Sequence, residues 1–173
     1  RLGDSAAAEA HFKAGLRATP ADVYLKGAYA DLMLLQHLDA EVIELLKGTE
    51  SQDVLLLRLA IAGQRLRTSE AAKWAQLYDA RRRASRPDDN PHLREHARFL
   101  LEVSNDPDKA LQLAQQNWQV QREPADVRIY LHAAQKARRS HAADVVRDWV
   151  RDTGYEDRTL DATLLAAALP SQR

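Results

Sequence analysis

The chain has 173 residues, with 25 Lys and Arg, 25 Asp and Glu and no cysteine, so its formal net charge is zero. The absence of cysteine excludes disulfides, thiol catalysis and cysteine-ligated zinc, and the balanced charge argues against a globally basic nucleic-acid binder. No apolar run approaches the ~20 residues of a membrane-spanning helix, so we expect a soluble protein, cytoplasmic or exported. Because the sequence starts at Arg1 and not at Met, we expect a piece of a longer or processed chain.

The hydrophobic residues favour helices over strands. Ala and Leu supply 55 of the 78 hydrophobic residues, whereas Val and Ile supply only 12. Ala and Leu lose little conformational freedom in a helix, while β-branched residues are the ones that strands prefer. The composition therefore predicts an all-α protein.

Capping residues and helix breakers divide the chain into about ten short helices. Ser, Thr, Asp and Asn are favoured just before a helix, Pro is favoured at its first position and Gly just after its end. In chain order these signals predict helices at 5–18, 21–36, 39–47 and 53–67, one from Thr68-Ser69 to about Ser85, further starts at Asn90-Pro91, Asp106-Pro107 and Pro124, one from Ser140 to near Gly154, and a last one that begins at Asp157.

The predicted helices repeat in pairs. Alternate helices start near residues 21, 53, 91, 125 and 158, which gives spacings of 32, 38, 34 and 33 residues. Turns of only a few residues between successive helices favour antiparallel neighbours. We therefore expect stacked helical hairpins with a period of about 34 residues.

Residues at four positions of the first helix and the turn after it match a known repeat. Ala8, Phe12, Gly15 and Pro20 have the spacing at which the second helix of a tetratricopeptide repeat carries small residues, an aromatic residue and a closing proline, with Gly15 in place of Ala. Candidates for the small position on first helices are Ala28, Ala60, Ala97 and Ala133 or Ala134. The chain thus resembles the tetratricopeptide repeat (TPR) family over most of its length.

The resemblance implies a fold and a domain organisation. The implied fold is a right-handed α-solenoid of antiparallel TPR-like hairpins, formed as a single repeat domain over residues 1–173. The implied divisions are a half repeat at 1–20, repeats near 21–52, 53–90, 91–124 and 125–157, and a C-terminal capping helix at 158–169.

The same resemblance implies a non-enzymatic scaffold that binds a peptide or a partner protein. In TPR proteins the first helices line the concave face, so candidate binding residues are taken from these helices. Arg94 and Arg98 are four residues apart and are candidates to clamp a carboxylate of the partner. The full candidate set is Tyr29, Arg58, Gln64, Arg94, Arg98, Arg128, Tyr130 and Gln135. We expect no catalytic residue, no cofactor and no bound metal.

Two alternative functions rest on short motifs. Residues 92–96 read His-Leu-Arg-Glu-His, in which His92 and His96 have the spacing for a shared zinc ion with Glu95 as the base of a hydrolase. Such a site needs a third ligand, for which Glu102 and Glu123 are candidates. The TPR resemblance instead gives His96 a packing role.

The second alternative is a nucleic-acid-binding helical repeat. It rests on arginine clusters at 81–83 with Arg86, and at Arg138-Arg139. Arginines near a helix C-terminus also stabilise the negative end of the helix dipole. We therefore do not expect nucleic-acid binding.

Overall fold

The computed structural model describes residues 4–84, 92–157 and 160 of the chain. This part contains nine α-helices, one 3-10 helix and no strand, so the predicted all-α fold class is confirmed. The described residues divide into two compact units, one at 4–84 and the other at 92–157 with 160. We call them the N-terminal unit and the C-terminal unit and describe each by itself. The prediction of a single domain over 1–173 stays a prediction.

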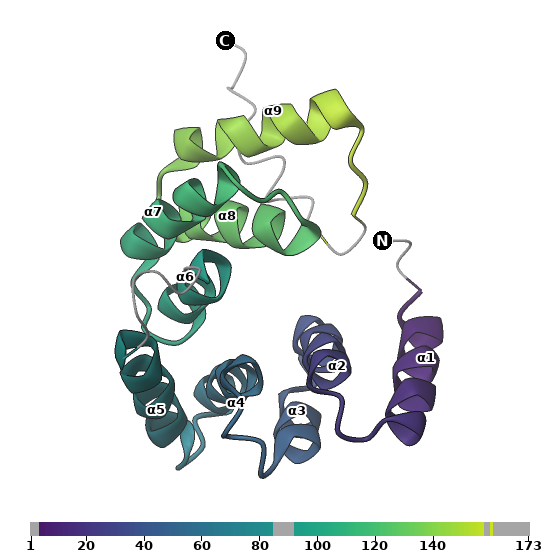
Figure 1. The fold of residues 1–173 in the computed structure, drawn as a ribbon. Coiled ribbons are helices and arrows are strands. Elements are labelled where there is room, and N and C mark those ends of the chain that lie inside the picture. The colour runs from purple at the N-terminus through teal and green to yellow at the C-terminus, as the bar shows by residue number, and fades with distance from the viewer. Residues whose placement is uncertain (1–3, 85–91, 158–159, 161–173) are drawn as a thin grey trace. The chain divides into compact units, whose positions relative to one another are not determined.

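The N-terminal unit holds five of the helices (Figure 1). Their bounds are α1 Ser5–Ala18, α2 Val23–Leu35, α3 Asp39–Leu46, α4 Asp53–Leu66 and α5 Ala71–Ala84.

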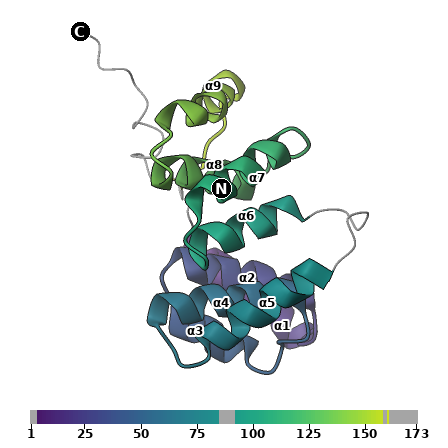
Figure 2. The same ribbon diagram turned by 90° about the vertical axis from the view of Figure 1, so that its left-hand side faces the viewer.

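The C-terminal unit holds the other four α-helices, which follow one another from α6 to α9 in Figure 2. Their bounds are α6 Leu93–Glu102, α7 Pro107–Trp118, α8 Pro124–Lys136 and α9 Asp144–Thr153, and a 3-10 helix η1 at Ser140–Ala143 precedes α9. The single helix predicted from Ser140 to near Gly154 therefore begins as the 3-10 helix η1 and continues as the α-helix α9. The predicted starts at Asn90-Pro91 and the predicted helix at 158–169 lie outside the described residues, except for the buried Leu160.

Aspartates cap several helix starts, at Asp4 and Asp106 as the sequence predicts and at Asp22 one residue after the predicted start at Ala21. The Asp4 carboxylate accepts a hydrogen bond from the Ala7 N–H at 2.9 Å, and the Asp22 carboxylate accepts one from the Leu25 N–H at 2.9 Å. Asp106 caps α7 in the same way, directly before Pro107. Each cap satisfies a backbone donor that the helix itself leaves unpaired.

Both units pack their helices in one order. In the N-terminal unit α2 packs on α3 and α4 packs on α5, and α4 also contacts both α2 and α3. In the C-terminal unit α6 packs on α7, and α8 contacts both α6 and α7. Each unit is thus built from helical hairpins in which the first helix of one hairpin packs on both helices of the hairpin before it. We call α2, α4, α6 and α8 the first helices.

The centre of the N-terminal unit is α4. Every residue from Leu55 to Gly63 is buried, including Arg58, as the nearly continuous apolar sequence predicts. Gly63 brings α4 close to α5, because a Cβ at this position would lie only 2.9 Å from Cζ3 of Trp74. The core of the C-terminal unit centres on Trp118, whose ring meets the rings of Tyr130 and Trp149 edge to face.

One residue with a left-handed backbone lies in the turn inside each hairpin. These are His37, Arg67, Asn105 and Arg138, with φ between 53° and 58°. In three of the four turns, the residue after the left-handed one donates its N–H to the carbonyl five residues earlier in the chain. This hydrogen bond is the usual helix-ending motif. Glycine is the usual residue with such a backbone, but the positive-φ glycines of the described residues, Gly48 and Gly154, follow α3 and α9 and lie outside these four turns. We call these turns the hairpin tips.

Candidate interaction surface

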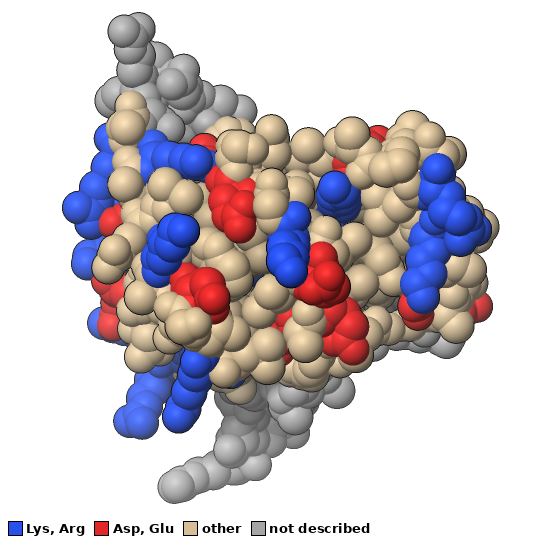
Figure 3. Space-filling view, turned by 90° about the horizontal axis from the view of Figure 1, so that it is seen from below, with Lys and Arg blue, Asp and Glu red and all other residues tan. Residues whose placement is uncertain are grey.

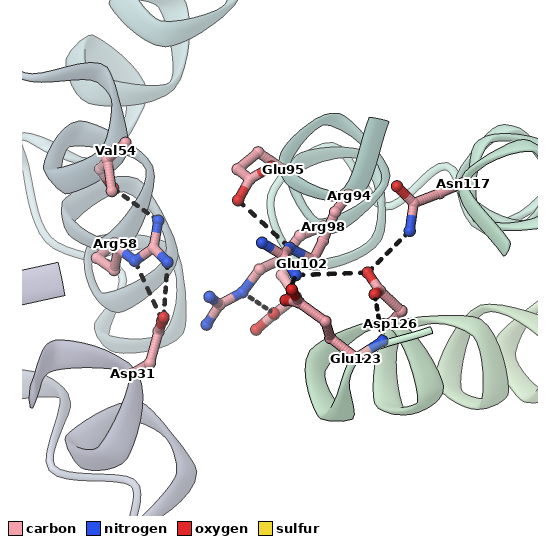
Figure 4. A network of polar contacts seen from close by, with 10 residues as sticks. All are labelled: Asp31, Val54, Arg58, Arg94, Glu95, Arg98, Glu102, Asn117, Glu123 and Asp126. Carbon is pink, nitrogen blue, oxygen red and sulfur yellow. Dashed lines mark hydrogen bonds and ion pairs between the residues drawn. The ribbon is translucent and has the colours of Figure 1, made fainter. Parts of the chain in front are cut away.

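The first helices of the N-terminal unit lie side by side and run in the same direction. Near their N-terminal ends, the Val54 side chain of α4 lies over Gly27 of α2, 3.4 Å from where a Cβ would be. Further along, the Arg58 guanidinium donates to both carboxylate oxygens of Asp31, at 3.1 and 2.6 Å (Figure 4). These contacts define one continuous face shared by α2 and α4.

The Arg58–Asp31 pair neutralises the middle of this face. Arg58 is only 8% exposed, and its third contact is a hydrogen bond to the Val54 carbonyl at 2.9 Å. A bidentate ion pair of this kind matches the planar guanidinium to the carboxylate and compensates the buried charge. The centre of the face therefore carries no net charge.

Large apolar side chains are exposed on both sides of this ion pair. Tyr24 is 85% exposed and Val54 44% exposed near the N-terminal ends of the helices, and Leu35 is 38% exposed near the C-terminal end of α2. Tyr24, Asp31 and Leu35 follow a helical spacing of seven and four residues, so they share one stripe of α2. We define the apolar face as Tyr24, Asp31 and Leu35 of α2 with Val54 and Arg58 of α4.

The first helices of the C-terminal unit present a polar network in the corresponding place (Figure 4). Arg94 of α6 pairs with Glu123 at the N-cap of α8 and lies 3.7 Å from the Asp126 carboxylate. Asp126 is buried and accepts hydrogen bonds from the Asn117 side chain at 2.8 Å and from the Glu123 N–H at 2.7 Å. Its burial raises the pKa of the Asp126 carboxyl above the ordinary value.

The Arg94–Glu123 contact recurs one repeat later. Arg128 pairs with Asp157 at 2.9 Å, and both members of this second pair lie 34 residues after those of the first. An arginine of one first helix thus reaches a carboxylate about 29 residues further along the chain in both cases. The repeated contact has the period that the helix starts predict.

The structure places two predicted binding residues in the interior. Tyr29 is 5% exposed and stacks on Phe12 of α1, with ring centroids 5.4 Å apart. Tyr130 is 3% exposed and contacts Trp118. Burial raises the pKa of both tyrosines. Neither ring offers a partner much surface, and both serve to pack one helix on the next.

The four predicted arginines are engaged with carboxylates of this chain. Arg58, Arg94 and Arg128 pair as described above, and Arg98 donates to Glu102 at 2.8 Å. A carboxylate of a partner would therefore have to displace Glu102 and Glu123 before Arg94 and Arg98 clamp it. The predicted Gln64 and Gln135 are exposed and available for contacts.

Sequence reasoning missed Tyr24, Leu35 and Val54. Val54 is the first residue of an apolar run, and such a run predicts buried side chains. Tyr24 is the second residue of its helix, and this position does not predict whether its side chain is exposed. A usable signal is the spacing of Tyr24 and Leu35 from the charged Asp31, which lies on the same stripe of α2.

The His-Leu-Arg-Glu-His motif has no completed ligand set in the described part of the chain. His92 is the exposed residue before α6, and the two candidate third ligands, Glu102 and Glu123, pair with Arg98 and Arg94. Among residues 4–84, 92–157 and 160, no group of three or more His, Asp or Glu side chains is arranged to hold a metal ion.

The main arginine cluster is paired with carboxylates. Arg81 pairs with Asp53 at 3.0 Å, and Arg82 and Arg83 both pair with Asp79. Arg86 lies outside the described residues. Figure 3 shows basic and acidic side chains interspersed over the face in view, so no single sign dominates it.

No family model, no curated protein and no solved structure matches this chain. None of the helices in the described ranges has the length and apolar character needed to cross a membrane.

Proposed function

We propose that the protein is a non-enzymatic scaffold of TPR-like hairpins that binds a segment of a partner protein on its first helices. In this proposal the hairpins continue as a right-handed α-solenoid, and the apolar face of the N-terminal unit is the main docking surface. The observation that carries the proposal is the exposure of Tyr24, Val54 and Leu35 on one face of two adjacent first helices.

Packing of α1 on α2 supports the TPR-like assignment. Phe12 stacks on Tyr29, and Gly15 lies against Leu25, so close that a Cβ at Gly15 would be 2.7 Å from Cδ2 of Leu25. Two of the four residues that carry the resemblance in the sequence, Phe12 and Gly15, therefore face the next first helix. Small residues at such positions let two helices approach each other.

The chemistry of the apolar face indicates what it binds. An exposed aromatic ring and two exposed aliphatic side chains gain most from apolar side chains of a partner, because burial on both sides removes apolar surface from water. The Arg58–Asp31 pair leaves the middle of the apolar face without net charge. A charged residue of the partner therefore gains little binding energy there. Tyr24 and Leu35 are eleven residues apart on α2, about 16 Å at the helical rise of 1.5 Å per residue.

A partner that covers this distance as a helix needs about three turns. We therefore propose an amphipathic helix whose apolar stripe contacts both ends of the face. Affinity comes from burial of Tyr24 and Val54, and the preformed surface keeps the entropic cost low on this side of the complex.

Site-specific photo-cross-linking tests the proposal. The photoreactive residue p-benzoylphenylalanine replaces Tyr24 in one variant and Gln116, an exposed residue of the second helix α7, in a control variant. The proposal expects a discrete cross-linked partner from position 24 and none from position 116. The same partner, purified, then binds the unmodified protein and loses at least about tenfold in affinity to Tyr24→Asp, because an aromatic anchor that becomes buried contributes about 2 kcal/mol.

Cross-links from position 116 but not from position 24 contradict the proposal. Equal affinity of the purified partner for the unmodified protein and for Tyr24→Asp also contradicts it. Helicity measured by circular dichroism checks that the variant is folded, which we expect because Tyr24 is exposed.

A further inference from the structure

The four hairpin tips differ in charge although their backbones are alike. The residues that follow the left-handed position include Asp39 in the first tip, Glu70 in the second, and Asp106 with Asp108 in the third. In the fourth tip, Arg138 is followed by Arg139, Ser140 and His141, and no carboxylate occurs before Asp144. Positive charge is therefore concentrated at one of four equivalent turns.

The side chains of the fourth tip point into solvent. Lys136, Arg138, Arg139 and His141 are all exposed, and we call these four residues the basic tip. Within the described part of the chain, Lys136 and Arg138 make no ion pair. Arg139 reaches Asp108 at 3.4 Å, where both side chains are about two-thirds exposed, so this contact is weak.

Other charged groups around the basic tip neutralise one another. Lys109 pairs with Asp106 at 2.7 Å on α7, and Arg147 pairs with Asp144 at 2.9 Å on α9. The His141 ring lies 3.5 Å from the same Asp144. Among the residues that the structure describes, the positive charge of Lys136, Arg138 and Arg139 is thus opposed only by Asp108.

Arg138 occupies the left-handed position of the fourth tip. Its φ of 55° is a conformation that glycine adopts without cost and that a residue with a Cβ adopts at a cost. The helix dipole favours a cation near the C-terminal end of α8. Lys136 already supplies this cation from a helical position, so the dipole does not require an arginine at position 138. Arg67 has the same backbone at the second tip, so the fourth tip is distinguished by its consecutive cations, which have a single weak carboxylate contact at Asp108.

We propose that the basic tip binds an acidic segment of a partner protein. The three cations form a compact patch of complementary charge, and carboxylates match the guanidinium groups of Arg138 and Arg139 in pairs. The patch is small and the chain as a whole is neutral, so the extended positive field that attracts a nucleic acid is missing. The surface is separate from the apolar face, so this inference does not depend on the proposed function.

Fluorescence anisotropy with a labelled oligoglutamate peptide at low ionic strength tests the proposal. We expect Arg138→Gly to weaken binding about threefold, and Arg138→Gly with Arg139→Ser to weaken it about tenfold, since each exposed charge pair contributes modestly. The matched control is Arg67→Gly, which removes an arginine from the equivalent left-handed position of the second tip. This control leaves binding unchanged.

The glycine variants also separate binding from folding. Both Arg138→Gly and Arg67→Gly relieve a left-handed backbone, so both raise the melting temperature. Weaker peptide binding by the more stable Arg138→Gly variant therefore supports the proposal directly.

Three results would overturn the proposal. The first is no binding of oligoglutamate by the unmodified protein at low ionic strength. The second is an equal loss of binding in Arg67→Gly and Arg138→Gly. The third is tighter binding of an oligonucleotide of the same charge that depends on Arg138 and Arg139, which would assign the surface to a nucleic acid.

Discussion

The two units share one order of helix contacts, but their first helices differ in surface chemistry. In the N-terminal unit, α2 and α4 bury one ion pair and expose Tyr24, Leu35 and Val54. In the C-terminal unit, α6 and α8 carry a network of charged residues, and the large apolar residues exposed among its described residues, Val120 and Val145, lie outside both first helices. The same backbone arrangement thus carries exposed apolar side chains, the proposed docking surface, in one unit and an internal ion-pair network in the other.

The role of arginine also differs between the units. Arg58 is buried and holds two helices together through a carboxylate on the neighbouring helix. Arg94 is about a quarter exposed and shares three carboxylates, Glu95, Glu123 and Asp126. Breaking a buried pair leaves an uncompensated charge, whereas an exposed network can rearrange or hydrate. We therefore expect loss of Asp31 to destabilise its unit more strongly than loss of Glu123 destabilises the other.

The largest effect that we expect is from Asp31→Ala. Removal of this carboxylate leaves the buried Arg58 guanidinium with only the Val54 carbonyl, so the free energy of unfolding of the N-terminal unit falls by about 2–3 kcal/mol. Glu123→Ala in the C-terminal unit loses only about 1 kcal/mol, because its carboxylate is 59% exposed. Hydrogen exchange measured by mass spectrometry reports the two units separately.

The double variant Asp31→Leu with Arg58→Met is the control. Apolar residues of similar size remove both charges together, so most of the lost stability returns. If the double variant is as unstable as Asp31→Ala, the loss does not come from an uncompensated charge.

A smaller effect separates two glycines of the N-terminal unit. Gly63→Ala places a methyl group 2.9 Å from the Trp74 ring and lowers the free energy of unfolding by about 1–3 kcal/mol. Gly27→Ala meets Val54 at an ordinary contact distance of 3.4 Å, so the gain in helix propensity raises stability by up to about 1 kcal/mol. Thermal unfolding followed by circular dichroism gives both values. Changes of the same sign in both variants would contradict the close approach of α4 and α5.

The smallest effect is a pH dependence in the C-terminal unit. Burial raises the pKa of Asp126 above its ordinary value of 3.8, so the neutral carboxyl is favoured in the folded state. Its stabilising contribution is complete below pH 3.8 and is lost as the pH rises through the folded-state pKa. We therefore expect the stability of the unmodified protein relative to Asp126→Asn to fall between pH 3 and pH 7. The measurement is the free energy of unfolding of both proteins across this range. A difference that grows with pH would mean that Arg94 lowers the pKa of Asp126 more than burial raises it.

Much of the fold follows from local sequence signals. Asp4 and Asp106 begin helices where predicted, because capping depends only on residues within one turn. The contacts between hairpins depend on side chains about 30 residues apart, such as Arg58 with Asp31, and no local pattern encodes these partners.

The candidate surface was harder to predict than the fold. Tyr29 and Tyr24 stand on the same helix five residues apart, and only packing against Phe12 of α1 decides that Tyr29 is buried and Tyr24 exposed. Likewise, Arg58 lies in an apolar helix, and the sequence alone suggests that its side chain is available to bind a partner protein. Only the structure shows that it pairs with Asp31 of α2. Hairpin tips closed by His37, Arg67 and Arg138 carry no glycine and so give no turn signal of the usual kind.

A hydrogen-exchange footprint of the bound partner tests the central claim most directly. The protein is measured with and without the partner that cross-links to position 24, and peptides from each helix are compared. We expect slower exchange in α2 and α4 and unchanged exchange in α6 and α8. A footprint confined to α6 and α8 would contradict the assignment of the apolar face as the docking surface.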